Sequence, residues 1–257
     1  MNKIKSNLGA ILVIDSGIGG LSTLIQATQL SNLNYIYFAD NKYAPYGKKS
    51  TLFLKNRLSQ IISSISKKFK ILAVVLACNT ATTSSIDYLR NTFPKLTIIG
   101  TEPAYKIAKD KRYKFPAIIA TPRTIDSISN KVDKTFKLLP NKTLASLIEK
   151  NFINPSPFHN FLLLKEILKI KHCIKSNDCL ILGCTHYVFI KSKLSKFINI
   201  PLIDGNYGVS KQIFKFFGSI TNEKQSIKII LSDQNSNSLQ KYKKILKQIL
   251  ANQIKLC

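Results

Sequence analysis

The segment Ile71-Leu-Ala-Val-Val-Leu-Ala-Cys-Asn-Thr80 carries the pattern that decides the fold class. Its first seven residues are apolar without a break, as in a strand of a parallel sheet that is buried on both faces, and the run ends in a thiol, an amide and a hydroxyl group. A second segment, Leu180-Ile-Leu-Gly-Cys-Thr-His-Tyr187, ends in a similar way. Two explanations are open: both cysteines are buried like small hydrophobic residues, or they are a pair of catalytic thiols.

Apolar runs alternate with helical patterns along the whole chain of 257 residues. Helices are expected at Thr51–Lys68, Phe161–His172 and Leu239–Ile249, where apolar residues recur at three- and four-residue spacing. The apolar runs that predict strands cover residues 10–14, 35–39, 71–77, 97–99, 117–120, 179–182, 201–203 and 227–231. Short strands that alternate with helices indicate mainly parallel sheets covered on both faces, so we expect an α/β fold.

Two turn-rich passages, Gly100-Thr-Glu-Pro103 and Asp204-Gly-Asn-Tyr-Gly208, are candidate domain boundaries. The two cysteine-bearing strands lie on either side of the first boundary. Ligands of open α/β sheets bind at the carboxyl ends of the strands, which is where Cys78 and Cys184 fall. If the two halves have similar folds, these strand ends face each other across a cleft, which favours the catalytic explanation.

The composition is that of a protein with a substantial buried core, since 45% of the residues are hydrophobic. No apolar run approaches the roughly 18 residues that a membrane-spanning helix needs, so we expect no membrane partner. The segment Met1–Lys5 has the charge of a signal-peptide start, but the apolar stretch Ala10–Ile14 that follows is too short for one. We therefore expect a cytoplasmic protein.

The net charge of +26 raises the question of a nucleic-acid partner. Only four of the 39 basic residues are arginines, the residue type better suited to bidentate recognition of phosphates and bases. The lysines are spread through nearly every expected helix. We interpret the excess mainly as charge on solvated helix faces, in preference to a nucleic-acid function, and expect a weak attraction for acidic small molecules.

Cysteine usage favours reduced thiols, because the number of cysteines is odd and a chain of this length needs no disulfide staples. The five cysteines are Cys78, Cys173, Cys179, Cys184 and Cys257. With His172 and His186 they suggest zinc as an alternative. None of them shows the paired short spacing of a structural zinc site, so we expect no metal.

Two further strand-to-helix connections carry polar groups. The turn Asp15-Ser-Gly-Ile-Gly-Gly20 could bind a carboxylate or phosphate through backbone N–H groups, although it lacks the spacing of a dinucleotide-binding fingerprint. Asp15 or Ser16 could instead be a helix cap. In the second connection, Pro45, Tyr46 and Gly47 suit a rigid turn that offers N–H groups to an anion, and Ser50 suits a helix N-cap.

Both strand-end cysteines are expected next to a helix N-terminus, which shifts a thiol toward the thiolate. The helix after Cys78 should begin near Thr80, and Thr185 and His186 should open the helix after Cys184. His186 could hydrogen-bond the thiol or carry its proton, or it could be structural.

Five motifs in register make the chain resemble the glutamate racemases of the cofactor-independent aspartate/glutamate racemase superfamily. They are Asp15-Ser-Gly-Ile-Gly-Gly-Leu21, Pro45-Tyr-Gly47 with Lys49-Ser50, Ala77-Cys-Asn-Thr-Ala81, Ala120-Thr-Pro-Arg-Thr-Ile125 and Leu182-Gly-Cys-Thr-His-Tyr187. Thr82 and His186 stand where aspartate-type members tend to carry histidine and glutamate, which favours glutamate as the substrate.

The resemblance implies two pseudo-symmetric α/β domains, formed by residues 1–99 with 208–257 and by residues 100–207, with the active site in the cleft between them. It implies racemisation of glutamate without a cofactor, with D-glutamate serving peptidoglycan synthesis and thus cell shape. The sequence leaves the oligomeric state open, with a homodimer as one option. Cys78, assisted by Asp15, would deprotonate D-glutamate, and Cys184, assisted by His186, would deprotonate L-glutamate.

The remaining implied residues bind the substrate or lie near the catalytic groups. The substrate's carboxylates and ammonium group would be held by Ser16, Pro45, Tyr46, Gly47, Asn79, Thr80, Thr121 and Thr185. Glu149 aligns with a family glutamate near the active site, although its flanking residues match poorly; its alternative is a solvated carboxylate at a helix end. Two rival functions stay open: racemisation of another acidic amino acid, and a basic, nucleic-acid-associating protein that retains the scaffold without activity.

Overall fold

The computed structural model describes residues 9–220, 222 and 224–254. The segment Met1–Lys5 and Cys257, both interpreted from the sequence above, lie outside the described residues. The chain divides into two compact units. The first comprises the described residues up to Thr101 and from Asn206 onward, and the second is Glu102–Gly205. Within the described residues, no helix combines the length and the apolar character needed to cross a membrane.

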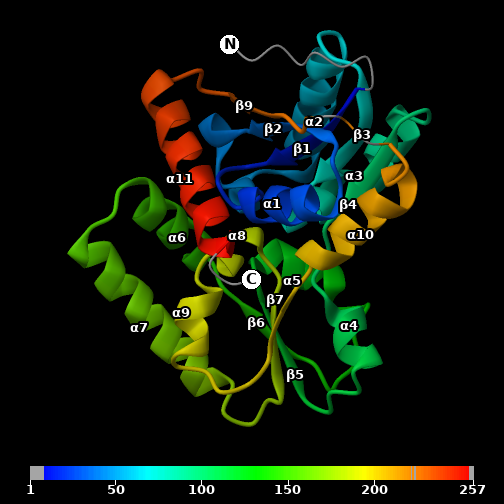
Figure 1. Cartoon of the computed structure of the whole chain (residues 1–257). Coiled ribbons are helices and arrows are strands. Elements are labelled where there is room, and N and C mark those ends of the chain that lie inside the picture. Colours follow the sequence, from blue (N-terminus) through cyan, green and yellow to red (C-terminus); the bar gives the residue numbers. More distant parts are fainter. Residues whose placement is uncertain (1–8, 221, 223, 255–257) are drawn as a thin grey trace. The chain divides into compact units, whose positions relative to one another are not determined.

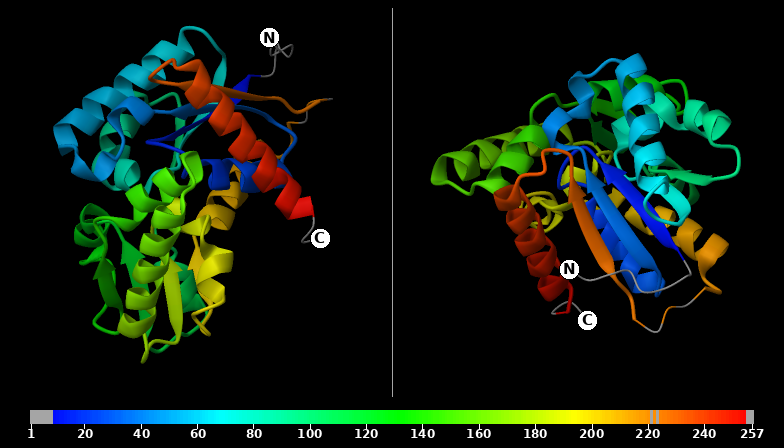
Figure 2. Two further views of the ribbon diagram at one scale, coloured as in Figure 1. Left: turned by 90° about the vertical axis from the view of Figure 1, so that its left-hand side faces the viewer. Right: turned by 90° about the horizontal axis from the view of Figure 1, so that it is seen from above.

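The first unit is built on a parallel sheet with the strand order β4-β3-β1-β2-β9. Its strands are β1 (Ala10–Asp15), β2 (Asn34–Ala39), β3 (Ile71–Leu76), β4 (Thr97–Gly100) and β9 (Ile227–Leu231). The chain returns after the second unit to add β9, drawn in orange, beside the blue β2 (Figures 1 and 2). This pairing completes the sheet with a strand from the far end of the sequence.

Helices cover both faces of this sheet. They are α1 (Leu21–Leu30), α2 (Thr51–Ser66), α3 (Asn79–Thr92), α10 (Asn206–Phe217) and α11 (Ser236–Ile254), with the short 3-10 helices η1 (Asn41–Tyr43) and η2 (Tyr46–Lys48) after β2. The helix α2 packs against α3, and α1 packs against α10 and α11. Leu12 and Ile14 of β1 belong to the core under α2 and α3, and every residue of β1 is buried. A central strand covered on both sides explains why its sequence is apolar without alternation.

The second unit has its own parallel sheet, with the strand order β6-β5-β7-β8. The strands are β5 (Pro116–Ala120), β6 (Lys137–Pro140), β7 (Cys179–Leu182) and β8 (Leu202–Asp204). Its helices are α4 (Tyr105–Asp110), α5 (Pro122–Ile128), α6 (Leu144–Ile153), α7 (Pro157–Cys173), α8 (Thr185–Val188) and α9 (Lys191–Ser195). One core lies on each face of the sheet, so this unit too is a covered parallel sheet.

The predicted α/β class is confirmed, and each of the eight expected strands is present with ends within one residue of the prediction. The sequence analysis missed β6. This strand has only two apolar residues, between Lys137 and Pro140, and it lies at the edge of its sheet, where neither apolar continuity nor full hydrogen bonding is required.

Parallel pairing brings the carboxyl ends of neighbouring strands to one edge in each unit. In the first unit the N–H of Ala77 donates to the carbonyl oxygen of Ile14 at 2.9 Å, and that of Asp40 donates to Asp15 at 2.9 Å. In the second unit the N–H of Gly183 donates to the carbonyl oxygen of Ile119 at 2.8 Å. The residues that follow these strands are therefore neighbours within their own unit.

Candidate active site

Cys78 lies where β3 gives way to α3. It is the N-cap of α3, in an extended conformation, and its side chain is only 9% exposed. Its carbonyl oxygen accepts the N–H of Thr82 at 3.0 Å, the first bond of the helix. The helix begins at Asn79, one residue before the predicted start. Because the partial positive charge of a helix N-terminus stabilises an anion, this position favours the thiolate of Cys78.

Asp15 is fully buried at the end of β1, and its Oδ1 accepts the N–H of Gly17 at 2.9 Å. The alternative that Asp15 or Ser16 caps the next helix is wrong, because α1 begins after Gly20. A Cβ on Gly20 would lie 2.7 Å from the Cβ of Asp15 and 2.9 Å from that of Ala77. The glycine therefore allows the turn to pass close over Asp15 and over the residue that precedes Cys78.

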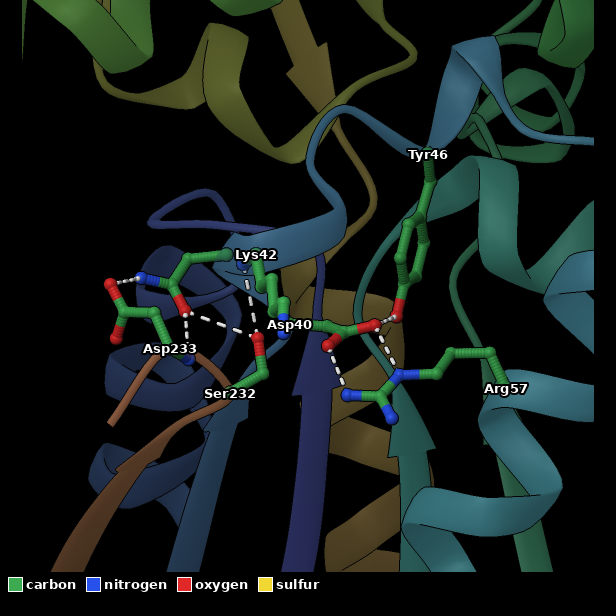
Figure 3. Close-up of polar contacts among 7 residues, drawn as sticks. Asp40, Lys42, Tyr46, Arg57, Ser232 and Asp233 are labelled. Carbon is green, nitrogen blue, oxygen red and sulfur yellow. Dashed lines mark hydrogen bonds and ion pairs between the residues drawn. The ribbon is translucent and has the colours of Figure 1, made fainter. Parts of the chain in front are cut away.

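The turn at Pro45, Tyr46 and Gly47 is present as the start of η2. The predicted N-cap is confirmed: Ser50 Oγ accepts the N–H of Phe53 at 3.1 Å, at the start of α2. Tyr46 is buried, and its hydroxyl donates to Asp40 Oδ2 at 2.8 Å (Figure 3). Burial raises the pKa of Tyr46 well above its usual value, and the charges of Asp40 and Cys78 raise it further. Tyr46 and Cys78 belong to the same hydrophobic core.

Cys184 occupies the matching position in the second unit, where β7 gives way to α8. It is the N-cap of α8 and is 9% exposed, the same fraction as Cys78. Its Sγ lies 3.9 Å from His186 Nδ1. Gly183 lies directly before it, and a Cβ there would come within 2.8 Å of the Cβ of Ala120 and 3.0 Å of the carbonyl oxygen of Ile119. The absence of a side chain at Gly183 lets β7 end close against β5.

His186 connects the thiol to a carboxylate. Its Nε2 is hydrogen-bonded to Oε2 of Glu149, a residue of α6, which packs against α8. Burial by itself would lower the pKa of His186, but the hydrogen bonds with Cys184 and Glu149 and the charge of Glu149 raise it well above its usual value. The arrangement favours a protonated imidazolium beside Cys184.

The N-terminus of α6 is held by Asn141, which the sequence analysis did not single out. Its Oδ1 accepts the N–H of Leu144 at 2.8 Å, and its own N–H donates to the carbonyl oxygen of Ala120 at 2.8 Å. Asn141 directly follows β6. Because the sequence analysis did not predict this strand, it could not identify Asn141 as a residue at a strand end either. The end of β5 also carries Thr121, whose Oγ1 caps α5 by accepting the N–H of Thr124.

The predicted site residues are divided between the two units. The first unit contains Asp15, Ser16, Pro45, Tyr46, Gly47, Cys78, Asn79 and Thr80, and the second contains Thr121, Glu149, Cys184, Thr185 and His186. Sequence reasoning assigned no role to Asp40 and Arg57, which bond to each other, or to the bond that Asp40 accepts from Tyr46. Asp40 was detectable, because it follows a buried strand as Asp15 does.

The other described cysteines lack this setting. Cys179 is fully buried within β7, and burial, with a further contribution from Asp178, raises the pKa of its thiol to about 12. Cys173 is exposed at the end of α7. Among the described residues, no group of three or more His, Cys, Asp or Glu side chains is arranged to hold a metal ion.

Comparison with known proteins gives consistent matches, although no family model matches the chain. A glutamate racemase of Clostridium botulinum is 37% identical over 250 residues, which cover 90% of this chain and 95% of the relative. Among solved structures, Escherichia coli glutamate racemase in complex with L-glutamate and the activator UDP-MurNAc-Ala matches with a TM-score of 0.78 and 25% identity, over 93% of this chain and 94% of that one. Francisella tularensis glutamate racemase in complex with D-glutamate matches with a TM-score of 0.77 and 26% identity, over 94% and 95%.

Proposed function

The chain belongs to the glutamate racemase family, and from this membership we propose that it interconverts L-glutamate and D-glutamate with Cys78 and Cys184 as its acid and base. One observation carries the assignment of the two thiols. Each unit has a nearly buried cysteine at the junction of a parallel strand and a helix N-terminus.

Racemisation needs one group that removes the α-proton and another that delivers a proton to the opposite face of the α-carbon. We assign removal from D-glutamate to Cys78 and removal from L-glutamate to Cys184. In each direction one cysteine begins as the thiolate and the other as the thiol, and the two exchange states in one turnover. The proposal therefore requires both sulfur atoms to reach the same α-carbon, from opposite sides.

The two thiols have different assistants. Cys184 lies beside His186, which can hold the thiol's proton or stabilise the thiolate, and Glu149 stabilises the charged form of the imidazole. In the first unit, Asp15 is a buried carboxylate at the end of the strand next to β3, and we assign it to Cys78. The acid and base chemistry thus needs only protein side chains, which is the basis for proposing a reaction without added cofactor.

Substrate binding is assigned to polar groups at the same strand ends. A glutamate carries two carboxylates and one ammonium group, so it needs several hydrogen-bond donors and at least one acceptor. The exposed backbone at Gly47 and the first N–H groups of α3 and α8 suit carboxylates. The proposed binding residues are Ser16, Pro45, Tyr46, Gly47, Asn79, Thr80, Thr121 and Thr185.

The first experiment follows the optical activity of L-glutamate by circular dichroism, with purified protein and no added cofactor. Cys78→Ala and Cys184→Ala should each abolish the loss of signal, whereas Cys173→Ala should keep the parent rate, because Cys173 is an exposed thiol that is not among the site residues. An inactive parent protein that is folded would contradict the function. Full activity in either site variant would contradict the two-thiol assignment.

A reaction in D2O separates two acid and base groups from one. With two thiols, the proton delivered to the product comes from a group that has exchanged with solvent, so D-glutamate formed first from L-glutamate should carry deuterium at the α-carbon. The unreacted L-glutamate should still carry protium. Product that retains protium would mean that a single group removes and returns the same proton.

We further propose glutamate over other acidic amino acids, a role in supplying D-glutamate for peptidoglycan, a cytoplasmic location and a homodimeric assembly. Competition between glutamate and aspartate in the racemisation assay tests the substrate. Sedimentation of the purified chain tests the homodimer: a single species with the mass of one chain at micromolar concentration would contradict it.

A further inference from the structure

A buried carboxylate joins three elements next to the proposed binding turn. Asp40 directly follows β2 and is fully buried. Its Oδ1 accepts a hydrogen bond from Arg57 Nη2 at 2.6 Å, and its Oδ2 accepts from Arg57 Nε at 2.9 Å and from the hydroxyl of Tyr46 at 2.8 Å (Figure 3). Arg57 belongs to α2 and Tyr46 to η2, so one side chain fixes the end of β2, a short helix and a long helix to one another.

Arg57 is held on a second side as well. The carbon atom at the centre of its guanidinium group lies 4.7 Å from the centroid of the Tyr43 ring, which belongs to η1. The planar guanidinium thus forms a two-pronged ion pair with Asp40 while it contacts the aromatic ring, a geometry that lysine cannot reproduce. Arg57 thus contacts η1 through Tyr43 and is connected to η2 through Asp40 and Tyr46.

The beginning of the same segment is tied to the C-terminal part of the unit. Asn41 Nδ2 donates to Asp233 Oδ2 at 2.6 Å, and the N–H of Lys42 donates to Ser232 Oγ at 3.0 Å (Figure 3). These bonds hold η1. In η2, Tyr46 is the buried residue, whereas Gly47 and Lys48 are exposed.

We infer that Asp40 and Arg57 are positioning residues, which hold Tyr46 and the exposed backbone of Gly47 in the geometry that substrate binding needs. This inference rests on the proposed function, in which the turn at residues 45–47 contacts glutamate. Neither Asp40 nor Arg57 is assigned a contact with the substrate. Both act through the ring and hydroxyl of Tyr46, which belongs to the same hydrophobic core as Cys78.

The expected kinetic signature is a change in KM. Contacts from the turn to a carboxylate exist in the bound substrate and in the transition state alike, so loosening them weakens both equally and leaves kcat nearly unchanged. The two enantiomers have equal free energies in water, so kcat/KM is the same in both directions. KM should therefore rise for L-glutamate and for D-glutamate together.

The variant Arg57→Lys tests this, with Arg90→Lys as its matched control. Arg90 is also a helix arginine of the first unit, although it is more exposed than Arg57, and it donates through Nε and Nη2 to the carbonyl oxygen of Ile98 at 3.3 and 3.1 Å. We expect KM to rise about tenfold in Arg57→Lys, with kcat within about threefold of the parent and no change in Arg90→Lys. A folded Arg57→Lys protein with the parent's KM would overturn the inference.

Limited digestion with trypsin gives a readout that does not depend on activity. Lys48 and Lys49 follow the turn and offer cleavage sites inside the segment. In Arg57→Lys, cleavage after these lysines should be about tenfold faster than in the parent. This rate corresponds to a free energy of local opening that is lower by about 1.4 kcal/mol. Cleavage at other sites, and cleavage of the control variant, should stay unchanged. If the parent does not racemise glutamate, the proposed function fails, and unchanged cleavage would show separately that the positioning role fails.

Tyr46→Phe provides a second variant in case Arg57→Lys does not fold. It removes only the hydroxyl that donates to Asp40 and keeps the buried ring and the ion pair. We expect its KM to rise in the same direction. In the double variant Arg57→Lys with Tyr46→Phe, the rise should be smaller than the product of the single effects, because both changes break the same connection. Fully multiplicative effects would overturn the inference.

Discussion

At the residue scale, His186 and Glu149 form a nearly buried charged pair whose stability depends on pH. Burial opposes the protonation of His186, whereas its hydrogen bonds with Cys184 and Glu149 and the charge of Glu149 favour it, and the net effect raises its pKa well above the usual value. Between the unfolded pKa of about 6.5 and the higher folded pKa, the folded state binds more protons than the unfolded state. The pair's contribution is therefore complete below about pH 6.5 and is lost as the pH rises through the folded pKa.

The variant Glu149→Gln should remove most of this pH dependence. With the charge of Glu149 gone, two of the causes that raise the pKa of His186 are weakened or lost while burial still lowers it, so the pKa falls and the folded state binds less of an extra proton in that window. We expect the parent to lose up to about 1.4 kcal/mol of unfolding free energy per pH unit above pH 6.5, and the variant to lose much less. Urea unfolding at pH 6, 7, 8 and 9 measures both slopes.

Glu166→Gln is the matched control for this prediction. Glu166 is a carboxylate of the same unit, and its pKa is lowered: burial opposes the charged form, but hydrogen bonds from Lys169 and Asn141 outweigh it. A lowered carboxyl pKa gives stability that is present above the unfolded value and lost only in acid. Glu166→Gln should therefore keep the parent's slope above pH 6.5, and an equal loss of slope in both variants would contradict the role given to His186.

Individual residues differed in how far the sequence could predict them. Cys78 and Cys184 could be placed at helix N-termini because each lies within two residues of the end of an apolar strand. The contact between Glu149 and His186 could not be derived from spacing, since 37 positions separate them, and only the family resemblance pointed to Glu149. The role of Arg57 could not be predicted from the sequence, because an arginine in a helix is expected to be solvated unless its partner is known.

At the element scale, the close approach of β7 to β5 makes Gly183 a sensitive position. In Gly183→Ala the new Cβ would lie 2.8 Å from the Cβ of Ala120 and 3.0 Å from a backbone oxygen, so one strand end must move. We expect a loss of about 1–3 kcal/mol in unfolding free energy. We also expect kcat/KM to fall about tenfold or more, because Cys184 is the next residue. Urea unfolding and the racemisation assay measure the two effects.

Gly208→Ala provides the contrasting glycine. Gly208 lies in α10, and a Cβ there would meet nothing within 4 Å. Alanine loses less backbone freedom on folding than glycine does, so this variant should gain about 0.5–1 kcal/mol with unchanged kinetics. A similar loss of stability in both variants would show that crowding at Gly183 is not the cause.

Elements were predictable where the sequence pattern had a single structural explanation. Unbroken apolar runs between helical patterns gave the buried strands, and Ser50 gave the start of α2. The strand β6 and the helix α9 were missed, since each is short and only partly apolar. Such elements form because they pack and hydrogen-bond with neighbouring strands and helices. The local sequence pattern says little about these tertiary contacts.

At the scale of the whole molecule, the positive charge has few internal partners. The sequence has 39 basic and 13 acidic residues. On α11 the lysines at positions 241, 243, 244 and 247 are exposed, while Tyr242, Ile245 and Leu246 face the core. This distribution supports the interpretation of the excess as charge on solvated faces, and it means that folding brings many like charges closer together.

Salt should therefore stabilise the protein. The Debye length falls from about 30 Å at 0.01 M to about 8 Å at 0.15 M ionic strength, so repulsion between separated lysines is largely screened at the higher value. We expect Tm to rise by about 2–4 °C between 0.01 and 0.3 M NaCl, which for a chain of this size corresponds to about 1 kcal/mol. Thermal unfolding followed by far-ultraviolet circular dichroism measures the change.

The choice of salt distinguishes screening from other effects. Screening depends on ionic strength alone, so NaCl and KCl should give the same rise in Tm at equal concentration, whereas sulfate adds stabilisation by exclusion from the protein surface. The rise should also level off above about 0.3 M, where the Debye length is already shorter than the spacing between most surface charges. A Tm that does not change between 0.01 and 0.3 M NaCl would mean that the lysines are spaced widely enough for their repulsion to be negligible. In that case the positive charge does not lower the stability of the folded protein, and binding of a polyanion would not raise it by relieving repulsion.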